Sequence, residues 1–159
     1  ILRYFNVAGA SKSGKIGEVG NKNGRLIKNL AIQYFKPKPI INVHGSNYKT
    51  KDGTCVRDYI HVSDIADIHY ECIKYLKKNL KSNIFNCGYG KGYSVLEIVN
   101  IFKKIKKNVK INFMKRRPGD VGQVHANTNK FKKTFKWKPK YNNINKILNS
   151  AINWEKKLR

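Results

Sequence analysis

Apolar residues along the chain follow two patterns, helical spacing and short continuous runs, which predict alternating helices and strands. Spacings of three and four residues, which place apolar side chains on one helix face, occur in residues 26–34, 65–76, 95–105 and 144–152. Short apolar runs bounded by turn residues predict strands at residues 40–44, 56–62, 83–87 and 110–114. Ser94 and Glu97 have the spacing of a capping box, which predicts a helix start at Val95. Strands that alternate with helices indicate the α/β class.

The segment Ile1 to Val7 is typical of a buried strand because it is mostly apolar and aromatic. A chain that opens inside such a strand, without an initiator methionine, is expected to be part of a longer protein. Pro37 and Pro39 are expected to end the helix that covers residues 26–34. Residues 45–54 are polar and predict a loop.

Length and composition exclude several protein classes. The chain has 159 residues, the size of one domain, and 40% of them are hydrophobic, which excludes wholesale disorder. No run of about 18 apolar residues and no charged-then-apolar leader occurs, so we expect neither a membrane span nor a secretory signal, and a cytoplasmic location. Cys55, Cys72 and Cys87 are widely spaced and odd in number, which predicts reduced thiols rather than disulfides.

The chain is strongly basic, with 34 Lys and Arg against 9 Asp and Glu and a net charge of +25. Of these bases 28 are Lys and 6 are Arg, whereas phosphate-binding surfaces favour the bidentate guanidinium of Arg. A nucleic-acid partner is therefore not expected. Within Lys130 to Tyr141, lysines alternate with aromatic residues, which fits a platform for single-stranded nucleic acid. We favour a short amphipathic helix that carries Phe131 and Phe135 on one face.

Acidic residues gather in one segment of this basic chain. Asp52 to Glu71 contains five of the nine acids and one base, Arg57. This uneven charge suggests a local electrostatic requirement and makes the segment the first place to look for chemistry.

Three further patterns resemble functional motifs, but a structural role explains each of them better. Gly88, Gly90 and Gly92 resemble a dinucleotide-binding turn, but Tyr93 stands where a third glycine is required. The cluster of His61, Asp64, Asp67 and His69 contains metal-ligand types, yet its side chains are expected to diverge, so no metal site is predicted. Tyr70 and Lys74 have the spacing of a general-base pair, but a helical projection points both toward solvent.

Two arginine-bearing turns leave two interpretations open. Arg57 follows a turn at the start of a strand, and the turn at Pro118 and Gly119 holds Arg117 near Asp120. Arginines so placed can grip a diphosphate bidentately, with the carboxylate on a ribose. Structural salt bridges would explain the same residues.

The motifs that carry a family resemblance occur in order along essentially the whole chain. They are Leu2 to Asn6 with Gly9 and Ala10, Asp52 to Val62 (DGTCVRDYIHV), Asn86 to Gly88 with Gly90 and Gly92, Arg116 to Asp120 (RRPGD), and Trp137 to Pro139. The chain resembles the carboxyl-terminal half of UDP-glucose 4-epimerases, a family of extended short-chain dehydrogenases. Other sugar-nucleotide epimerases and dehydratases carry looser versions of the DGTCVRDYIHV motif.

The resemblance implies a fold and an activity. Residues 1–10 would end an NAD-binding Rossmann domain, residues 11–159 would mainly form the substrate-binding domain, and residues 83–88 would add a strand to the Rossmann sheet. The cofactor would be NAD and the substrates UDP-glucose and UDP-galactose, interconverted by transient oxidation at C4. The glycine-rich loop and the catalytic Tyr and Lys would lie upstream of Ile1, so no catalytic residue is expected here. The complete protein would be a homodimer, and this chain without its amino-terminal half would be inactive.

The resemblance also implies roles for individual residues. Tyr4 and Phe5 would contact the cofactor. The substrate would be bound by Asn6, Leu26, Val43, His44, Arg57, Arg117 and Asp120, with Val43 and His44 on a strand that packs on uracil. Arg25 and Val124 depart from the family pattern and receive no role.

Overall fold

The computed structural model describes residues 1–20 and 25–159 and confirms the α/β class. The predicted elements occur in the expected order with shifts at their ends, and the structure adds short strands that were not predicted. The helices are α1 (Leu26–Tyr34), α2 (Val62–Asn79), α3 (Val95–Ile105), α4 (Asn129–Thr134) and α5 (Ile144–Lys157). The strands are β1 (Leu2–Tyr4), β2 (Asn6–Ala8), β3 (Ile40–His44), β4 (Val56–His61), β5 (Phe85–Cys87), β6 (Gly92–Ser94), β7 (Lys110–Met114) and β8 (Gln123–Val124).

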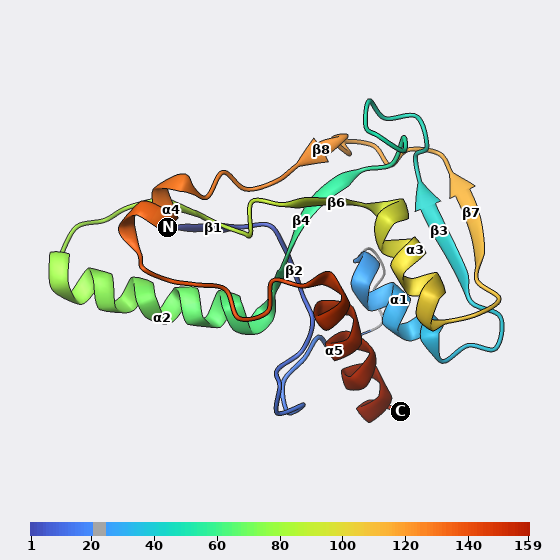
Figure 1. Ribbon diagram of the computed structural model, residues 1–159, viewed down its shortest axis with the longest axis horizontal. Coiled ribbons are helices and arrows are strands. Elements are labelled where there is room, and N and C mark those ends of the chain that lie inside the picture. Colours follow the sequence, from blue (N-terminus) through green and yellow to red (C-terminus); the bar gives the residue numbers. More distant parts are fainter. Residues whose placement is uncertain (21–24) are drawn as a thin grey trace.

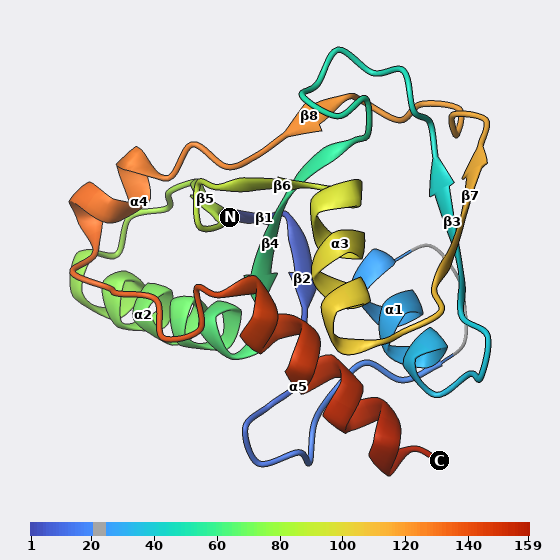
Figure 2. The same cartoon turned by 45° about the vertical axis from the view of Figure 1, so that its right-hand side comes forward.

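Strand β4 runs through the middle of the molecule and connects its two ends (Figure 1). It pairs in parallel with β2, so that Asn6 stands opposite Tyr59, and it pairs antiparallel with β6 and parallel with β8. Helices α2 and α4 lie at one end with β1, whereas α1, α3 and the β3–β7 ladder lie at the other (Figure 1). Seen after a 45° turn, α5 crosses below β2 and β4 (Figure 2).

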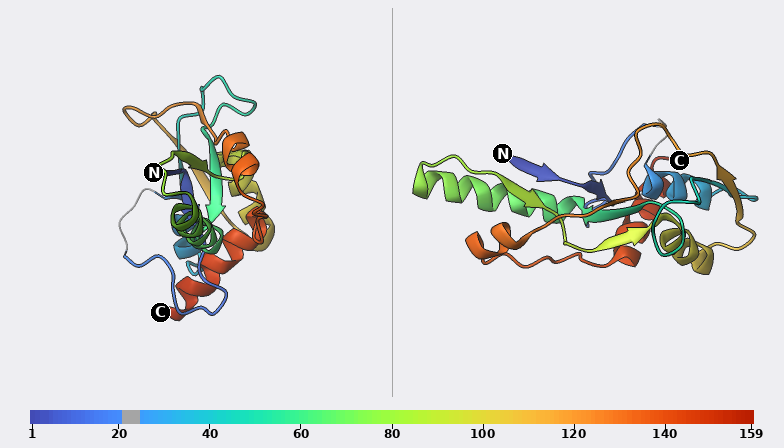
Figure 3. Two further views of the ribbon diagram at one scale, coloured as in Figure 1. Left: turned by 90° about the vertical axis from the view of Figure 1, so that its left-hand side faces the viewer. Right: turned by 90° about the horizontal axis from the view of Figure 1, so that it is seen from above.

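The opening segment differs from the predicted buried strand. It is divided at Phe5 into β1, which pairs in parallel with β5, and β2, which pairs with β4. Ile1 is 77% exposed and Tyr4 is 52% exposed. The reason is that β1 has β5 on one edge, while its apolar side chains and those of α2 line an open groove of about 760 Å³. Strand β1 and helix α2 lie side by side in Figure 3.

The apolar stripe predicted for α2 is buried over half its length. Ile65 and Ile68 are buried in the core, but Ile73 is 52% exposed and Leu76 is 48% exposed. These two residues border the same groove as β1. The periodicity therefore predicted the helix correctly, while the described residues cover one half of its apolar face.

The core is continuous from the helices to the central strand. Its fully buried members include Leu30 of α1, Ile60 of β4, Phe102 of α3 and Leu148 of α5. Burial of each such side chain contributes about 1.5–3 kcal/mol. The helices that surround β4 are thus held against one another, which fixes where the loops at its start can lie.

The start of the segment 130–141 belongs to the predicted short helix, α4, with Phe135 as its C-cap, and the segment is not a stacking platform. Phe131 and Phe135 are 2% and 8% exposed, with ring centroids 4.6 Å apart. Both rings also contact Phe85 of β5. Because their faces are buried in this cluster, they are not available to stack on bases.

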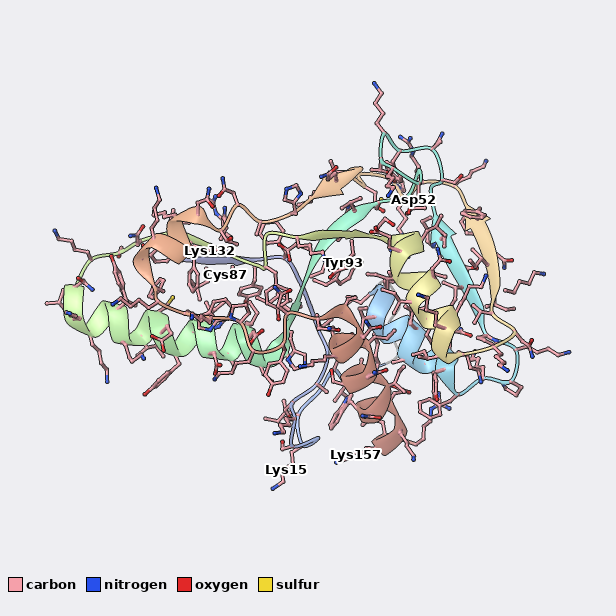
Figure 4. The ribbon with its side chains drawn as sticks, in the orientation of Figure 1. Lys15, Asp52, Cys87, Tyr93, Lys132 and Lys157 are labelled. Carbon is pink, nitrogen blue, oxygen red and sulfur yellow. The ribbon has the colours of Figure 1, made fainter. Side chains whose placement is uncertain are left out.

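The predicted capping box opens α3. Ser94 Oγ accepts a hydrogen bond from Glu97 N at 3.0 Å, and Glu97 Oε2 accepts one from Ser94 N at 2.7 Å. Ser94 Oγ also donates to the carboxylate of Asp52 in the loop before β4. The cap therefore ties α3 to that loop, where Asp52 stands above the start of the helix (Figure 4).

Replacing Ser94 with alanine is expected to lower the free energy of unfolding of the full-length protein by about 1–2 kcal/mol. The change removes both the cap and the hydrogen bond to Asp52. Urea unfolding followed by circular dichroism measures the loss, and Ser94→Thr, which keeps a hydroxyl, serves as the control. A loss in Ser94→Ala no larger than that in Ser94→Thr would contradict this role of the cap.

Candidate functional site

A cavity of about 160 Å³ lies at the start of β4, where several segments distant in sequence meet. It is lined by Asn6, Leu26, Asn29, Asn42, His44, Cys55, Arg57, Tyr59, Val95, Arg117 and Asp120. Arg57 and Arg117 therefore reach the same cavity, which is necessary if both are to bind one diphosphate. Of the predicted substrate residues, Asn6, Leu26, His44 and Asp120 stand there with them.

Arg57 is held in a fixed position on β4. Its Nη1 donates to the Val56 carbonyl at 2.9 Å, and its Nη2 lies 3.2 Å from Asp120 Oδ1. The Arg57 side chain is 17% exposed and that of Asp120 is 34% exposed. The salt bridge that the sequence left open is thus present, and both of its members face the cavity. A planar guanidinium in this setting can offer its remaining N–H groups to an anion.

The turn that carries Arg117 is closed by a short backbone contact. Asp120 N donates to the Arg117 carbonyl at 3.2 Å, and Gly119 has φ of +76°, a conformation that glycine adopts without strain. This turn brings Arg117 and Asp120 to one side of the cavity, facing Arg57.

Strand β3 shows its two faces to different surroundings. Asn42 and His44 line the cavity, whereas Ile41 and Val43 point into the core, where Val43 is fully buried. Successive side chains of a strand point to opposite faces, so Val43 and His44 cannot both face a ligand. The side chain of Val43 therefore does not line the cavity, and its place among the substrate-binding residues stays a prediction.

A second cavity of about 340 Å³ adjoins the first and shares Asn6, Leu26 and Tyr59 with it. Tyr4 and Phe5, the predicted cofactor residues, form part of its wall. Arg25 stands at its edge, with Nη1 3.2 Å from Glu18 Oε1. The structure thus places the predicted cofactor side directly beside the predicted substrate side.

The glycine turn after β5 is occupied from within the protein. The fully buried carboxylate of Asp58 accepts hydrogen bonds from Tyr89 N at 3.1 Å, Gly90 N at 2.9 Å and Ala126 N at 3.2 Å. A Cβ atom at Gly88 would come within 2.7 Å of the Ala126 Cβ, so the close approach requires glycine. The Tyr89 and Gly90 amides of the turn are therefore occupied by Asp58, and the interpretation of this turn as dinucleotide-binding is wrong.

Other acids of the acid-rich segment also have structural partners. Asp64 is fully buried and accepts hydrogen bonds from the Tyr89 hydroxyl at 2.5 Å and from the backbone N of Lys140 and Tyr141, each at 3.0 Å. Burial and the hydrogen bond to Asp64 raise the pKa of Tyr89 well above its usual value, so this phenol remains a donor. Burial opposes ionisation of Asp52, but hydrogen bonds from Ser94 and Thr54 outweigh it and lower the pKa of that carboxyl.

His61 lies next to Asp64 and serves as the N-cap of α2. Its Nδ1 accepts a hydrogen bond from Ser63 N at 3.1 Å, which places the ring hydrogen on Nε2, 3.3 Å from Ser150 Oγ. Burial lowers the pKa of His61 despite the nearby Asp64. In the described part of the chain, no group of three or more His, Cys, Asp and Glu side chains is arranged to hold a metal ion.

The Tyr70 and Lys74 pair points to solvent, as the helical projection predicted. Tyr70 is 63% exposed, and Lys74 Nζ lies 5.0 Å from its ring centroid and 2.6 Å from Glu71 Oε1. The pair lines neither of the two cavities.

Among residues 1–20 and 25–159, no helix has the length and apolar character needed to cross a membrane.

Comparison with known proteins identifies the family. The model of the NAD dependent epimerase/dehydratase family matches residues 1–88. The chain belongs to this family. A UDP-glucose 4-epimerase from Azospirillum brasilense is 40% identical over 159 residues, which cover 99% of this chain and 46% of that protein. The chain thus spans about half the length of the curated relatives it matches.

Solved structures of epimerases share the fold of this family member. The UDP-glucose 4-epimerase of Bifidobacterium longum, solved with NAD+ and UDP, aligns with a TM-score of 0.83 at 35% identity, over 98% of this chain and 47% of that one. The enzyme from Stenotrophomonas maltophila, solved with NAD and formylated UDP-arabinopyranose, has a TM-score of 0.87 at 31% identity, over 99% and 47% of the two chains. These likenesses confirm the resemblance derived from the motifs.

Several residues that line the first cavity of this epimerase-family chain were not predicted from the sequence. They are Asn29, Asn42, Cys55, Tyr59 and Val95. Two carried a usable signal: Asn29 is one helical turn after Leu26, and Asn42 shares a strand face with His44. The others reach the cavity through the path of the chain around β4, which no local pattern encodes.

Proposed function

We propose that this chain is the carboxyl-terminal, UDP-sugar-binding part of a UDP-glucose 4-epimerase, which interconverts UDP-glucose and UDP-galactose. The observation that carries the proposal is the meeting of Arg57, Arg117 and Asp120 at one cavity. Two guanidinium groups suit a diphosphate, and a carboxylate suits the hydroxyls of a ribose. The relatives named UDP-glucose 4-epimerase support this choice of ligand.

The nucleotide is proposed to lie along the first cavity. Arg57 and Arg117 would hold the diphosphate, Asp120 would accept hydrogen bonds from the ribose, and His44 would stack on the uracil. Leu26 would cover the nucleotide from the start of α1. Asn6, which borders both cavities, would contact the sugar where it enters the second.

The second cavity is proposed to receive the nicotinamide end of NAD. Its volume of about 340 Å³, the presence of Tyr4 and Phe5 in its wall and its contact with Asn6 fit a flat ring placed next to the sugar. The chemistry that NAD supplies when bound is transient oxidation of the sugar at C4. Phe5 and Tyr4 would orient the ring and exclude water. The phosphates of the cofactor are expected to bind outside this chain, because the amides of the 88–90 turn are bound to Asp58.

A domain boundary and a partner segment follow from the same proposal. We assign residues 1–10 and the strand within residues 83–88 to the NAD-binding sheet, and the remainder mainly to the substrate domain. The parallel pairing of Leu2 with Phe85 supports this assignment. The amino-terminal half of the protein is proposed to bring the catalytic Tyr and Lys, and the complete enzyme is proposed to be a cytoplasmic homodimer.

Product analysis tests the proposal. The full-length protein incubated with NAD and UDP-glucose is expected to yield UDP-galactose, whereas residues 1–159 alone are expected to yield none. Turnover by this chain alone would contradict the placement of the catalytic pair. Absence of turnover by the full-length protein, together with absence of UDP binding in calorimetry, would contradict the function.

A second candidate is another sugar-nucleotide epimerase of the same fold. It is favoured by the formylated UDP-arabinopyranose in the Stenotrophomonas enzyme and by a UDP-arabinose 4-epimerase from Arabidopsis thaliana that is 38% identical to this chain. Parallel assays with UDP-glucose, UDP-arabinose, UDP-N-acetylglucosamine and dTDP-glucose separate the candidates. A kcat/KM highest for UDP-glucose supports the first proposal.

A further inference from the structure

Arg116 and Arg117 are neighbours in sequence but make different contacts. Arg117 lines the first cavity with Asp120. Arg116 turns toward the loop 45–54, where its Nε donates to Asn47 Oδ1 at 2.7 Å and its Nη2 donates to the Asn47 carbonyl. Its guanidinium carbon also lies 4.0 Å from the centroid of the Tyr48 ring. Arg116 thus stacks on Tyr48 and forms two hydrogen bonds with Asn47, both residues of this loop.

Tyr48, a residue of the loop 45–54, packs against Gly45 of the same loop and against the segment that follows β7. It is 7% exposed. A Cβ atom on Gly45 would collide with its ring, and one on Gly122 would lie 3.4 Å from it. No hydrogen bond joins the buried Tyr48 hydroxyl to the described residues of the segment that follows β7. The ring, rather than the hydroxyl, therefore makes the contacts that hold the two segments together.

The Tyr48–Arg116 contact lies between two backbone hydrogen bonds that anchor the exposed segment. Gly45 N donates to the Met114 carbonyl at 2.9 Å, and Val56 N donates to the Gly122 carbonyl at 2.8 Å. The residues from Lys115 to Val121 between these anchors are all exposed. This segment carries Arg117 and Asp120 to the cavity. Between the two anchors, the contacts of Arg116 hold the start of the segment and the salt bridge from Arg57 to Asp120 holds its end, so both contribute to the position of Arg117 and Asp120.

We propose that Tyr48 and Arg116 form a clamp that positions Arg117 and Asp120 for binding of the UDP-sugar. The inference rests on the proposed function and assigns to Arg116 a positioning role without ligand contact. A planar guanidinium can stack on a ring and form two hydrogen bonds at once, which the ammonium of lysine cannot do. Loss of the clamp lets the segment move and weakens ligand binding, while the reacting sugar carbon and the cofactor are unaffected.

The expected signature is a rise in KM with an unchanged kcat. In the full-length enzyme, Arg116→Ala and Arg116→Lys are each expected to raise the KM for UDP-glucose about 10-fold, with kcat within about twofold of wild type. Tyr48→Phe, which keeps the stacked ring, is expected to retain the wild-type KM. Lys115→Ala removes one positive charge from the same exposed segment and is the matched control, with an expected KM within about twofold of wild type.

Coupling to Arg117 provides the sharper test. If Arg116 acts through Arg117 and Asp120, then Arg116→Ala is expected to raise KM less in an Arg117→Ala background than in the wild type. An equal fold-change in both backgrounds would overturn the clamp. Recovery of wild-type KM in Arg116→Lys would also overturn it, because charge alone would then explain the effect.

The outcomes separate this inference from the proposed function. An active wild-type enzyme in which Arg116→Ala leaves KM unchanged overturns the clamp and leaves the function intact. A wild-type protein that neither binds UDP nor converts UDP-glucose overturns the function, and the clamp with it.

Discussion

Replacement of Arg57 with alanine in the full-length protein is expected, on the proposed function, to raise the KM for UDP-glucose at least about 30-fold. Removal of one member of a buried, hydrogen-bonded charge contact costs on the order of 2–5 kcal/mol. Arg57 fits this case because its side chain is 17% exposed and its guanidinium faces the cavity from a fixed strand position. Steady-state kinetics with UDP-glucose and calorimetry with UDP measure the change.

Two control variants define what the loss means. Arg57→Lys keeps the charge but not the planar fork, so its KM is expected to lie between those of wild type and Arg57→Ala. Lys51→Ala removes a charge from the exposed loop before β4 and is expected to leave KM within about twofold of wild type. An unchanged KM in Arg57→Ala would remove Arg57 from the site and would contradict the placement of the diphosphate.

Replacement of Asp58 with alanine is expected to lower the free energy of unfolding by about 3–5 kcal/mol. The change leaves the N–H groups of Tyr89, Gly90 and Ala126 without their acceptor in the interior. Each buried group left unsatisfied costs about 1–3 kcal/mol, and water that enters the space left by the carboxylate recovers part of the sum. Chemical unfolding of the full-length protein measures the loss. Because β4 also carries Arg57, affinity for UDP is expected to fall in the same variant.

Asp58→Asn and Asp67→Asn are the matched controls. Asn at position 58 keeps an acceptor oxygen that can face Gly90 and Ala126, so about 1–2 kcal/mol is expected to be lost. Asp67 forms a surface ion pair with Lys140, with an N to O distance of 2.7 Å, and Asp67→Asn is expected to cost less than about 1 kcal/mol. Similar losses in Asp58→Ala and Asp67→Asn would contradict the role of Asp58.

Local patterns predicted the elements whose stability has a local cause. Helix α1 ends before Pro37, which cannot continue it, and α3 starts at the capping box of Ser94 and Glu97. The amphipathic spacing of α5 placed Ile147 and Leu148 correctly in the core. Strands β6 and β8 were missed because such short segments become strands only by pairing with β4.

The site was predicted in part. Arg57, Arg117 and Asp120 were found because turns and motifs mark them, and they do line one cavity. Of the two neighbours Val43 and His44, only His44 presents its side chain to the cavity, because successive side chains of a strand point to opposite faces. The acids near Arg57 suggested chemistry, yet Asp58 and Asp64 hold buried backbone amides, a role that depends on residues far away in sequence.

By itself, the sequence determined the α/β class, the ends of α1 and α3, the family motifs and the identity of the charged groups that the proposal places on the nucleotide. These features depend on neighbours within about one or two turns of the chain, so short-range patterns encode them. Only the tertiary structure decided which acids accept hydrogen bonds from backbone amides in the interior. It also decided that Val43 faces the core, and that Arg116 contacts the loop 45–54 while Arg117 faces the cavity. Each of these outcomes depends on contacts between segments distant in sequence, and such contacts arise only when the whole core packs around β4.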